Sequence, residues 1–125
     1  MLTRTFTAAI SGLTPIKIEV EIDSNRGTPN LIIIGLPTKA IEESKERITS
    51  ALINCGFRIR SRRTIVNLAP ADIRKSSPSF ELAIAVGMLQ MYGEIKIDTN
   101  QTIFFGELSL DGDLKPIKGA LPLII

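Results

Sequence analysis

Hydrophobic and polar residues follow three different patterns along the first part of the chain. Residues 16–22 alternate between isoleucine or valine and a charged residue, and this period of two predicts a strand with one buried face. Residues 6–10 form a weaker apolar stretch that also favours a strand. Residues 31–34 are continuously apolar, which predicts a strand covered on both faces. The polar residues 23–27 predict a turn before it.

The next segment, residues 38–55, has the pattern of an amphipathic helix. Thr38 can cap its start, and Gly56 is placed to end it in the left-handed conformation. Charged residues cover one face of this helix. The opposite, apolar stripe comprises Ile41, Ile48, Leu52 and Cys55. Because Cys55 ends this stripe, packing in the core is the favoured interpretation over a reactive thiol.

A second helix is predicted to be central and buried, because residues 82–91 are apolar on almost all sides. Ser77 and Pro78 have the pattern of an N-cap followed by proline at the first helical position. Glu81 lies near the start of this helix, where the helix dipole favours an anion.

The remaining segments complete a mixed pattern of strands and helices. Strands are predicted over 64–68 and 102–105, followed by a hairpin that turns through the two residues Asp111 and Gly112. A last helix is predicted from about Ile117. The order of elements predicts a mixed α/β (α+β) domain with two main helices on one sheet.

Composition excludes several classes of protein. The chain has 125 residues, which is the length of one domain, with no His and one Cys. A single Cys forms no internal disulfide, and without His the usual zinc sites and His-dependent triads are absent. No apolar run approaches the roughly 18–20 residues that span a bilayer. We therefore expect no membrane partner and a reducing, cytoplasmic location.

The net charge of +2 hides a basic segment at residues 58–75, where the local net charge is +5. Its basic residues are Arg58, Arg60, Arg62, Arg63, Arg74 and Lys75. Clustered guanidinium groups bind phosphates through charge and bidentate geometry, so this segment is the candidate contact with DNA. The competing interpretation is a solvated loop, or a surface that faces a neighbouring domain or subunit.

The sequence contains no complete active site. It has no phosphate-binding loop, and Gly35 between a strand and a helix is weak evidence for one. Glu81 and Glu107 could form an acid–base pair. The favoured interpretation is that Glu81 stabilises the start of the helix and that Glu107 pairs with a basic group or faces solvent. A Ser–Lys dyad is conceivable, although helix capping is the commoner role of such serines. Its candidate residues are Ser76, Ser77, Ser79, Lys115 and Lys118.

Several strings together resemble one family. They include VNLAPAD at 66–72, FELAIA at 80–85 and GELSLDG at 106–112. In order and spacing they look like the N-terminal domain of the magnesium-chelatase-like AAA+ ATPases, the competence protein M (ComM) family. The resemblance covers essentially the whole chain.

This resemblance implies a Lon-protease-like fold, which is also that of the RadA C-terminal domain and of the second domain of a small-subunit ribosomal protein. Residues 1–125 would then be a single Lon-like N-terminal domain, truncated before an AAA+ module. ATP and Mg would belong to that module, and this fragment would hold no cofactor. The family's members assemble as hexamers, and the best-understood ones promote DNA branch migration during natural transformation.

The Lon comparison argues against a peptidase. By position Ser79 falls near Lon's nucleophile, but Phe80 and Glu81 replace its small neighbours. The position of Lon's lysine is Leu123, and Lys118 comes about five residues too early. A leucine cannot deprotonate a serine, so the domain is expected to be non-catalytic.

Three functions therefore remain as alternatives. The leading one is a contact module of a DNA-acting AAA+ ATPase, with residues 58–75 meeting DNA, a partner or a neighbouring subunit. The second is a structural domain that packs the ring without touching DNA. The third is a diverged Ser–Lys peptidase.

Overall fold

The computed structural model describes residues 2–11, 14–35, 38–57, 62–69 and 80–115. The elements are β1 (Leu2–Ser11), β2 (Thr14–Arg26), β3 (Asn30–Ile34), α1 (Thr38–Asn54), β4 (Arg62–Ala69), α2 (Glu81–Met91), β5 (Glu107–Leu108) and β6 (Leu114–Lys115). Four strands form a sheet in the order β1-β2-β4-β3, and β5 pairs with β6 separately. Only the β3–β4 pair is parallel in the larger sheet. The predicted mixed α/β class, with one sheet and two main helices, is confirmed.

Strand β2 forms the centre of the core. Ile18, Val20 and Ile22 are fully buried, as the alternating pattern predicts, and the charged residues between them lie on the other face. The turn predicted at residues 23–27 is wrong for its first four residues. They extend β2 to Arg26, because they pair antiparallel with the first four residues of β4. Ladder pairing overrides the local preference of polar residues for a turn.

The prediction that residues 31–34 are covered on both faces is also wrong. Strand β3 lies at the edge of the sheet, and the helices cover only one of its faces. Ile33 points into the core and is buried, whereas Ile34 is 51% exposed. A continuous apolar run therefore does not distinguish a central strand from an edge strand here.

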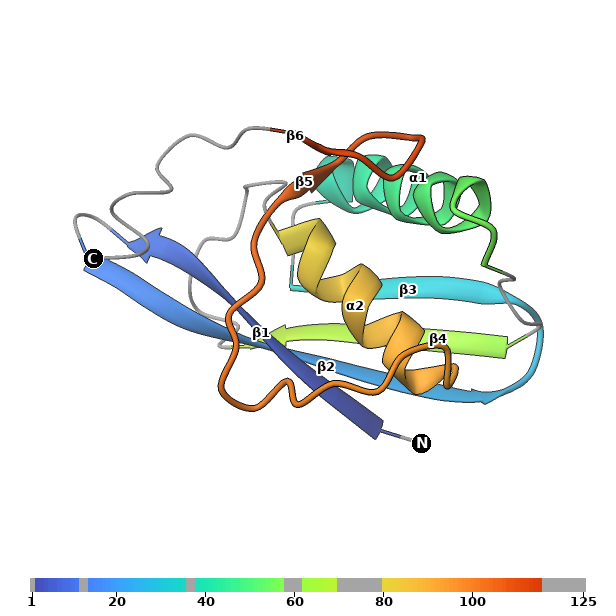
Figure 1. Cartoon of the computed structure of the whole chain (residues 1–125), viewed down its shortest axis with the longest axis horizontal. Helices are drawn as coiled ribbons and strands as arrows, with labels where there is room; N and C mark the ends of the chain where they lie inside the picture. The colour runs from blue at the N-terminus through green and yellow to red at the C-terminus, as the bar shows by residue number, and fades with distance from the viewer. Residues whose placement is uncertain (1, 12–13, 36–37, 58–61, 70–79, 116–125) are drawn as a thin grey trace.

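Helix α2 lies across the sheet, and α1 lies beside α2 near β3 (Figure 1). Most of α2 is buried, which confirms the prediction for residues 82–91. Gly87 allows the close approach of α2 to the sheet, because a Cβ there would collide with the Ile22 side chain. The hydroxyl of Thr5 in β1 donates to the Ala83 carbonyl oxygen at 2.9 Å. These contacts fix the position of α2 along β1 and β2.

Helix α1 is buried on the stripe that the sequence predicts, except at its end. Ile48 and Leu52 are buried, and Gly56 has φ +90°, in the left-handed region that ends the helix. Cys55, however, is exposed, so its predicted packing in the core is wrong. Its sulfur lies 3.6 Å from the Asp111 carbonyl oxygen, because α1 ends beneath the β5–β6 connection. The predicted caps Thr38 and Ser77 have side chains outside the described residues.

The C-terminal part contains less regular structure than predicted. Residues 102–105 form no strand: a single bridge joins Ile103 to Phe6, and the Phe104 N–H donates to the Phe6 carbonyl oxygen at 2.8 Å. The hairpin turns through five residues, 109–113, rather than two. Side-chain oxygens of Ser109 and Asp111 accept the Asp113 N–H, which stabilises this longer turn. The helix predicted from Ile117 lies outside the described residues.

We predict that Gly35→Ala lowers the free energy of unfolding by more than about 2 kcal/mol, because two penalties combine. Gly35 has φ +107°, and a Cβ there would lie 2.8 Å from the Leu68 carbonyl oxygen. Gly56→Ala is the matched control, since its φ is also positive but its Cβ would meet nothing within 4 Å. It should cost about 1 kcal/mol. Urea denaturation measures both, and equal costs would contradict the role of close packing at Gly35.

Candidate nucleic-acid interface

The basic segment predicted as a contact surface is described only in part. Arg62 and Arg63 are the first two residues of β4. Arg63 is exposed, and the structure describes the backbone of Arg62. The other four predicted residues, Arg58, Arg60, Arg74 and Lys75, lie outside the described residues. The structure therefore places one end of the segment, at the beginning of a central strand.

Strand pairing adds a cation that the charge count along the sequence misses. Arg26 ends β2 and is the direct partner of Arg62, while Asn25 lies opposite Arg63. Arg26 is exposed, as is Arg63, and neither forms an ion pair with another described residue. We call Arg26, Arg62 and Arg63 the basic strand end. The one acidic group close to it in β2 is Asp23, which accepts a hydrogen bond from Asn25.

The open face of the sheet is polar, and several of its charged side chains pair with one another. Arg4 in β1 contacts two carboxylates of β2, Glu19 at 2.9 Å and Glu21 at 3.6 Å. Asn67 in β4 donates to Glu21 at 3.1 Å. The ammonium group of Lys17 lies 4.1 Å from the centre of the Phe6 ring. These contacts engage Arg4 and Lys17 within the protein, whereas Arg26 and Arg63 form no ion pair with another described residue.

A buried carboxylate joins the two helices and the small hairpin. Glu81, the first residue of α2, is 1% exposed. One of its oxygens accepts the Ser44 hydroxyl at 2.9 Å and the Arg47 Nε–H at 2.7 Å, both from α1. The other oxygen accepts the Leu108 backbone N–H of β5 at 3.1 Å. We call these four residues the Glu81 clamp.

Burial raises the pKa of Glu81 above its usual value of 4.5. The hydrogen bond from Arg47 opposes this shift, as do those from Leu108 and Ser44 and the charge of Arg47. The carboxylate is fully occupied by structural partners, and it has no described contact with Glu107, which lies on β5. The arrangement therefore serves packing rather than the acid–base pair considered from the sequence.

The described residues contain little else with catalytic character. No group of three or more His, Cys, Asp or Glu side chains among them could hold a metal ion. Of the serines and lysines considered for a dyad, the structure describes only the backbone of Lys115. Ser79 and Leu123 lie outside the described residues. Within the described ranges, no helix is long and apolar enough to cross a membrane.

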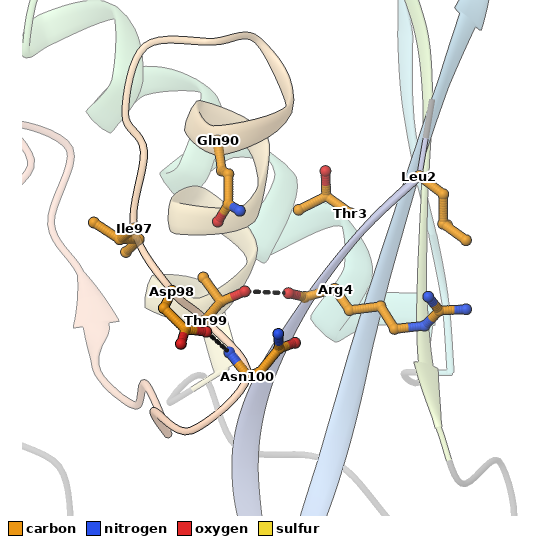
Figure 2. A pocket seen from close by; sticks show the side chains of 8 residues that line it. All are labelled: Leu2, Thr3, Arg4, Gln90, Ile97, Asp98, Thr99 and Asn100. Atoms are coloured by element: carbon orange, nitrogen blue, oxygen red, sulfur yellow. Dashed lines mark hydrogen bonds between the residues drawn. The ribbon is translucent and has the colours of Figure 1, made fainter.

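A polar pocket lies near the end of α2, whereas the Glu81 clamp lies at its start. Nothing in the sequence pattern indicates this pocket. Its volume is about 380 Å³. Figure 2 shows it between β1, the last turns of α2 and the segment 97–100. Its lining residues are Leu2, Thr3, Arg4, Gln90, Ile97, Asp98, Thr99 and Asn100. Sequence reasoning misses this pocket because its polar residues come from three separate segments.

Comparison with known proteins decides the family. Residues 20–125 match the family model described as subunit ChlI of Mg-chelatase. The chain belongs to this family. It is 34% identical over 121 residues to competence protein ComM of Haemophilus influenzae, an alignment that covers 96% of this chain and 24% of ComM. It is 34% identical over 118 residues to YifB of Escherichia coli, covering 92% of this chain and 23% of YifB.

A more distant similarity extends to Lon protease 2 of Bacillus subtilis, at 29% identity over 124 residues, which covers 90% of this chain and 22% of the protease. These matches confirm the predicted relationship to the ComM family and the similarity to Lon. The chain spans about a quarter of the length of the curated relatives it matches.

We predict that Arg47→Ala lowers the free energy of unfolding at pH 7 by about 3–5 kcal/mol, because it leaves the Glu81 carboxylate buried without its ionic partner. Glu43→Ala is the matched control, since it removes only the exposed carboxylate that lies 3.8 Å from Arg47. It should cost less than about 1 kcal/mol. Chemical denaturation followed by circular dichroism measures both. Similar costs for the two variants would show that the Glu81 clamp is not a principal support of the fold.

We also predict a pH dependence that Glu81→Gln removes. Because the pKa of Glu81 is raised in the folded state, that state binds more protons than the unfolded state at pH values above 4.5. The stability that Glu81 contributes therefore falls as pH rises through the interval between 4.5 and the folded-state pKa. The measurement is the difference in unfolding free energy between the wild type and Glu81→Gln from pH 4 to 8. A difference that grows in favour of the wild type as pH rises would overturn this prediction.

Proposed function

We propose that this chain is a Lon-like N-terminal domain of a magnesium-chelatase-like AAA+ ATPase that acts on DNA, and that it serves as a non-catalytic contact module. The family match and the similarity to ComM support this assignment. The similarity to Lon protease 2 supports the finer fold, shared with the second domain of a small-subunit ribosomal protein. ATP and Mg would bind to the AAA+ module of a cytoplasmic homo-hexamer.

The start of α2 supports the non-catalytic part of the proposal. Phe80 is 1% exposed, with its side chain in the core, and Glu81 is held by three hydrogen-bond donors. A nucleophile or an oxyanion site near this helix start would need space for a substrate. These two side chains take that space for packing, which agrees with the expectation drawn from the Lon comparison.

The observation that carries the DNA contact is the basic strand end. Two arginines, Arg26 and Arg63, are exposed on adjacent strands and lack an ionic partner among the described residues. Arg62 lies between them in the ladder. The register places Arg26 and Arg63 on opposite faces at the same end of the sheet, so together they can contact phosphates of a nucleic acid that passes around this end. Each guanidinium group can donate two hydrogen bonds to one phosphate. Their contact would be with the backbone rather than with the bases, and thus independent of sequence.

We predict that replacing both Arg26 and Arg63 by Ala weakens DNA binding and reduces its salt dependence. Each lost phosphate contact should lower the slope of log affinity against log salt by about 0.9 for duplex DNA, so the double variant should lose roughly 2. Fluorescence anisotropy with single- and double-stranded DNA between 50 and 200 mM salt, the range over which such contacts weaken strongly, measures both quantities.

The control is the double variant of Lys17 and Lys39 to Ala, which removes the same charge from two exposed positions, one near the other end of β2 and one in the first turn of α1. Its binding should change much less than that of the arginine variant. Equal losses in the two variants would show that only net charge matters, and binding unchanged by the arginine substitutions would overturn the proposed contact.

A second candidate function is packing against neighbouring subunits of the ring. Three large apolar side chains, those of Ile53, Leu110 and Leu114, are each more than half exposed near the end of α1 and the hairpin. Asn54 links these elements by donating to the Leu110 carbonyl oxygen at 2.7 Å. If the domain shows no DNA affinity, but its deletion from the parent protein abolishes the hexamer, ring packing replaces DNA contact as its function.

A further inference from the structure

The polar pocket of Figure 2 is separate from the basic strand end and from the Glu81 clamp. Its volume of about 380 Å³ is within the range of small-molecule sites, roughly 300–1,000 Å³. Unlike most such sites, it is lined mainly by polar groups. It therefore suits a small polar ligand that is recognised by hydrogen bonds and charge.

One of the groups at the pocket is an acceptor without a partner. The side-chain oxygen of Gln90 is shielded from solvent and accepts no hydrogen bond. Figure 2 shows the Gln90 amide pointing from α2 toward the segment 97–100. A buried acceptor without a donor costs about as much as a lost hydrogen bond, so a group that supplies the donor is favoured. The broad terminal torsion of glutamine allows the amide to turn toward such a group.

None of the described residues donates to this oxygen. The Thr99 hydroxyl already donates to the Arg4 carbonyl oxygen at 2.7 Å. The Arg4 guanidinium points away from the pocket, where Glu19 and Glu21 hold it. The Arg4 guanidinium is thus held by carboxylates on the opposite face of the sheet and does not donate into the pocket.

The second acceptor at the pocket is negatively charged. Asp98 is exposed, and one of its carboxylate oxygens accepts the Asn100 backbone N–H at 3.0 Å. That bond fixes the turn at 98–100 and leaves the second carboxylate oxygen for a ligand. An acceptor and a carboxylate on two sides of one cavity match a donor group that is also a cation.

We propose that this pocket binds a small molecule through a primary ammonium group, which donates to the Gln90 side-chain oxygen and pairs with the Asp98 carboxylate. The ammonium group has three donors, so it can satisfy both acceptors and still contact the polar wall near Thr3. This inference is independent of the proposed contact with DNA, because it uses none of the residues of the basic strand end.

The test uses the 125-residue chain and putrescine, with 1,4-butanediol as the neutral molecule of the same length. Titration at constant ionic strength is followed by ¹H–¹⁵N nuclear magnetic resonance. Putrescine should give saturable shifts at the Gln90 side-chain amide and at the backbone N–H groups of Thr99 and Asn100. Butanediol should give none. Shifts that do not saturate, or equal binding of butanediol, would overturn the proposal.

Two variants separate a ligand site from a structural feature. Asp98→Asn should raise the Kd for putrescine about tenfold or more, because it removes a charged partner. Asp113→Asn, on the exposed hairpin turn, should leave the Kd unchanged. Gln90→Met keeps the length of the side chain but removes the unpartnered oxygen. This variant should abolish putrescine binding without lowering the melting temperature of the protein. A lower melting temperature would show that Gln90 has a structural role instead.

Discussion

The arrangement of the helices depends on one buried carboxylate. Glu81 begins α2, but its hydrogen-bond donors come from α1 and β5. A charged group removed from water must be paired and hydrogen-bonded, and this requirement is met only when these three elements are in place together. The hydrophobic effect that drives apolar packing is non-directional. The Glu81 clamp provides the directional contacts that select one position.

The clamp also bears on where recognition is proposed. It lies at the start of α2, the region in which the resemblance to Lon would place a reactive serine. Here the same region is occupied by side chains that hold the fold together, Phe80 in the core and Glu81 between three donors. The two recognition features that we propose lie elsewhere. The basic strand end and the polar pocket are both surface features built from segments that lie far apart in the sequence.

The parts of the fold that follow from local pattern could be predicted from sequence, and those that follow from pairing could not. Alternation identified β2, and the apolar character of 82–91 identified α2 as central. The edge position of β3 depends on which strand lies beside β4, which hydropathy does not contain. The failure at Cys55 has the same origin, because the end of an apolar stripe meets the polar hairpin turn rather than the core.

The same limitation applies to the candidate site, and it explains why Arg26 was missed. A charge count along the sequence assigns Arg26 to a neutral segment, whereas the antiparallel register places it beside Arg62. The register has a second consequence for the charge of the sheet. It places Arg4 beside Glu19 and Glu21, so these charges compensate one another on the open face. Arg26 and Arg63, where β2 ends and β4 begins, form no such ion pair with another described residue. Strand pairing, rather than the abundance of arginine, creates the surface that we propose for DNA.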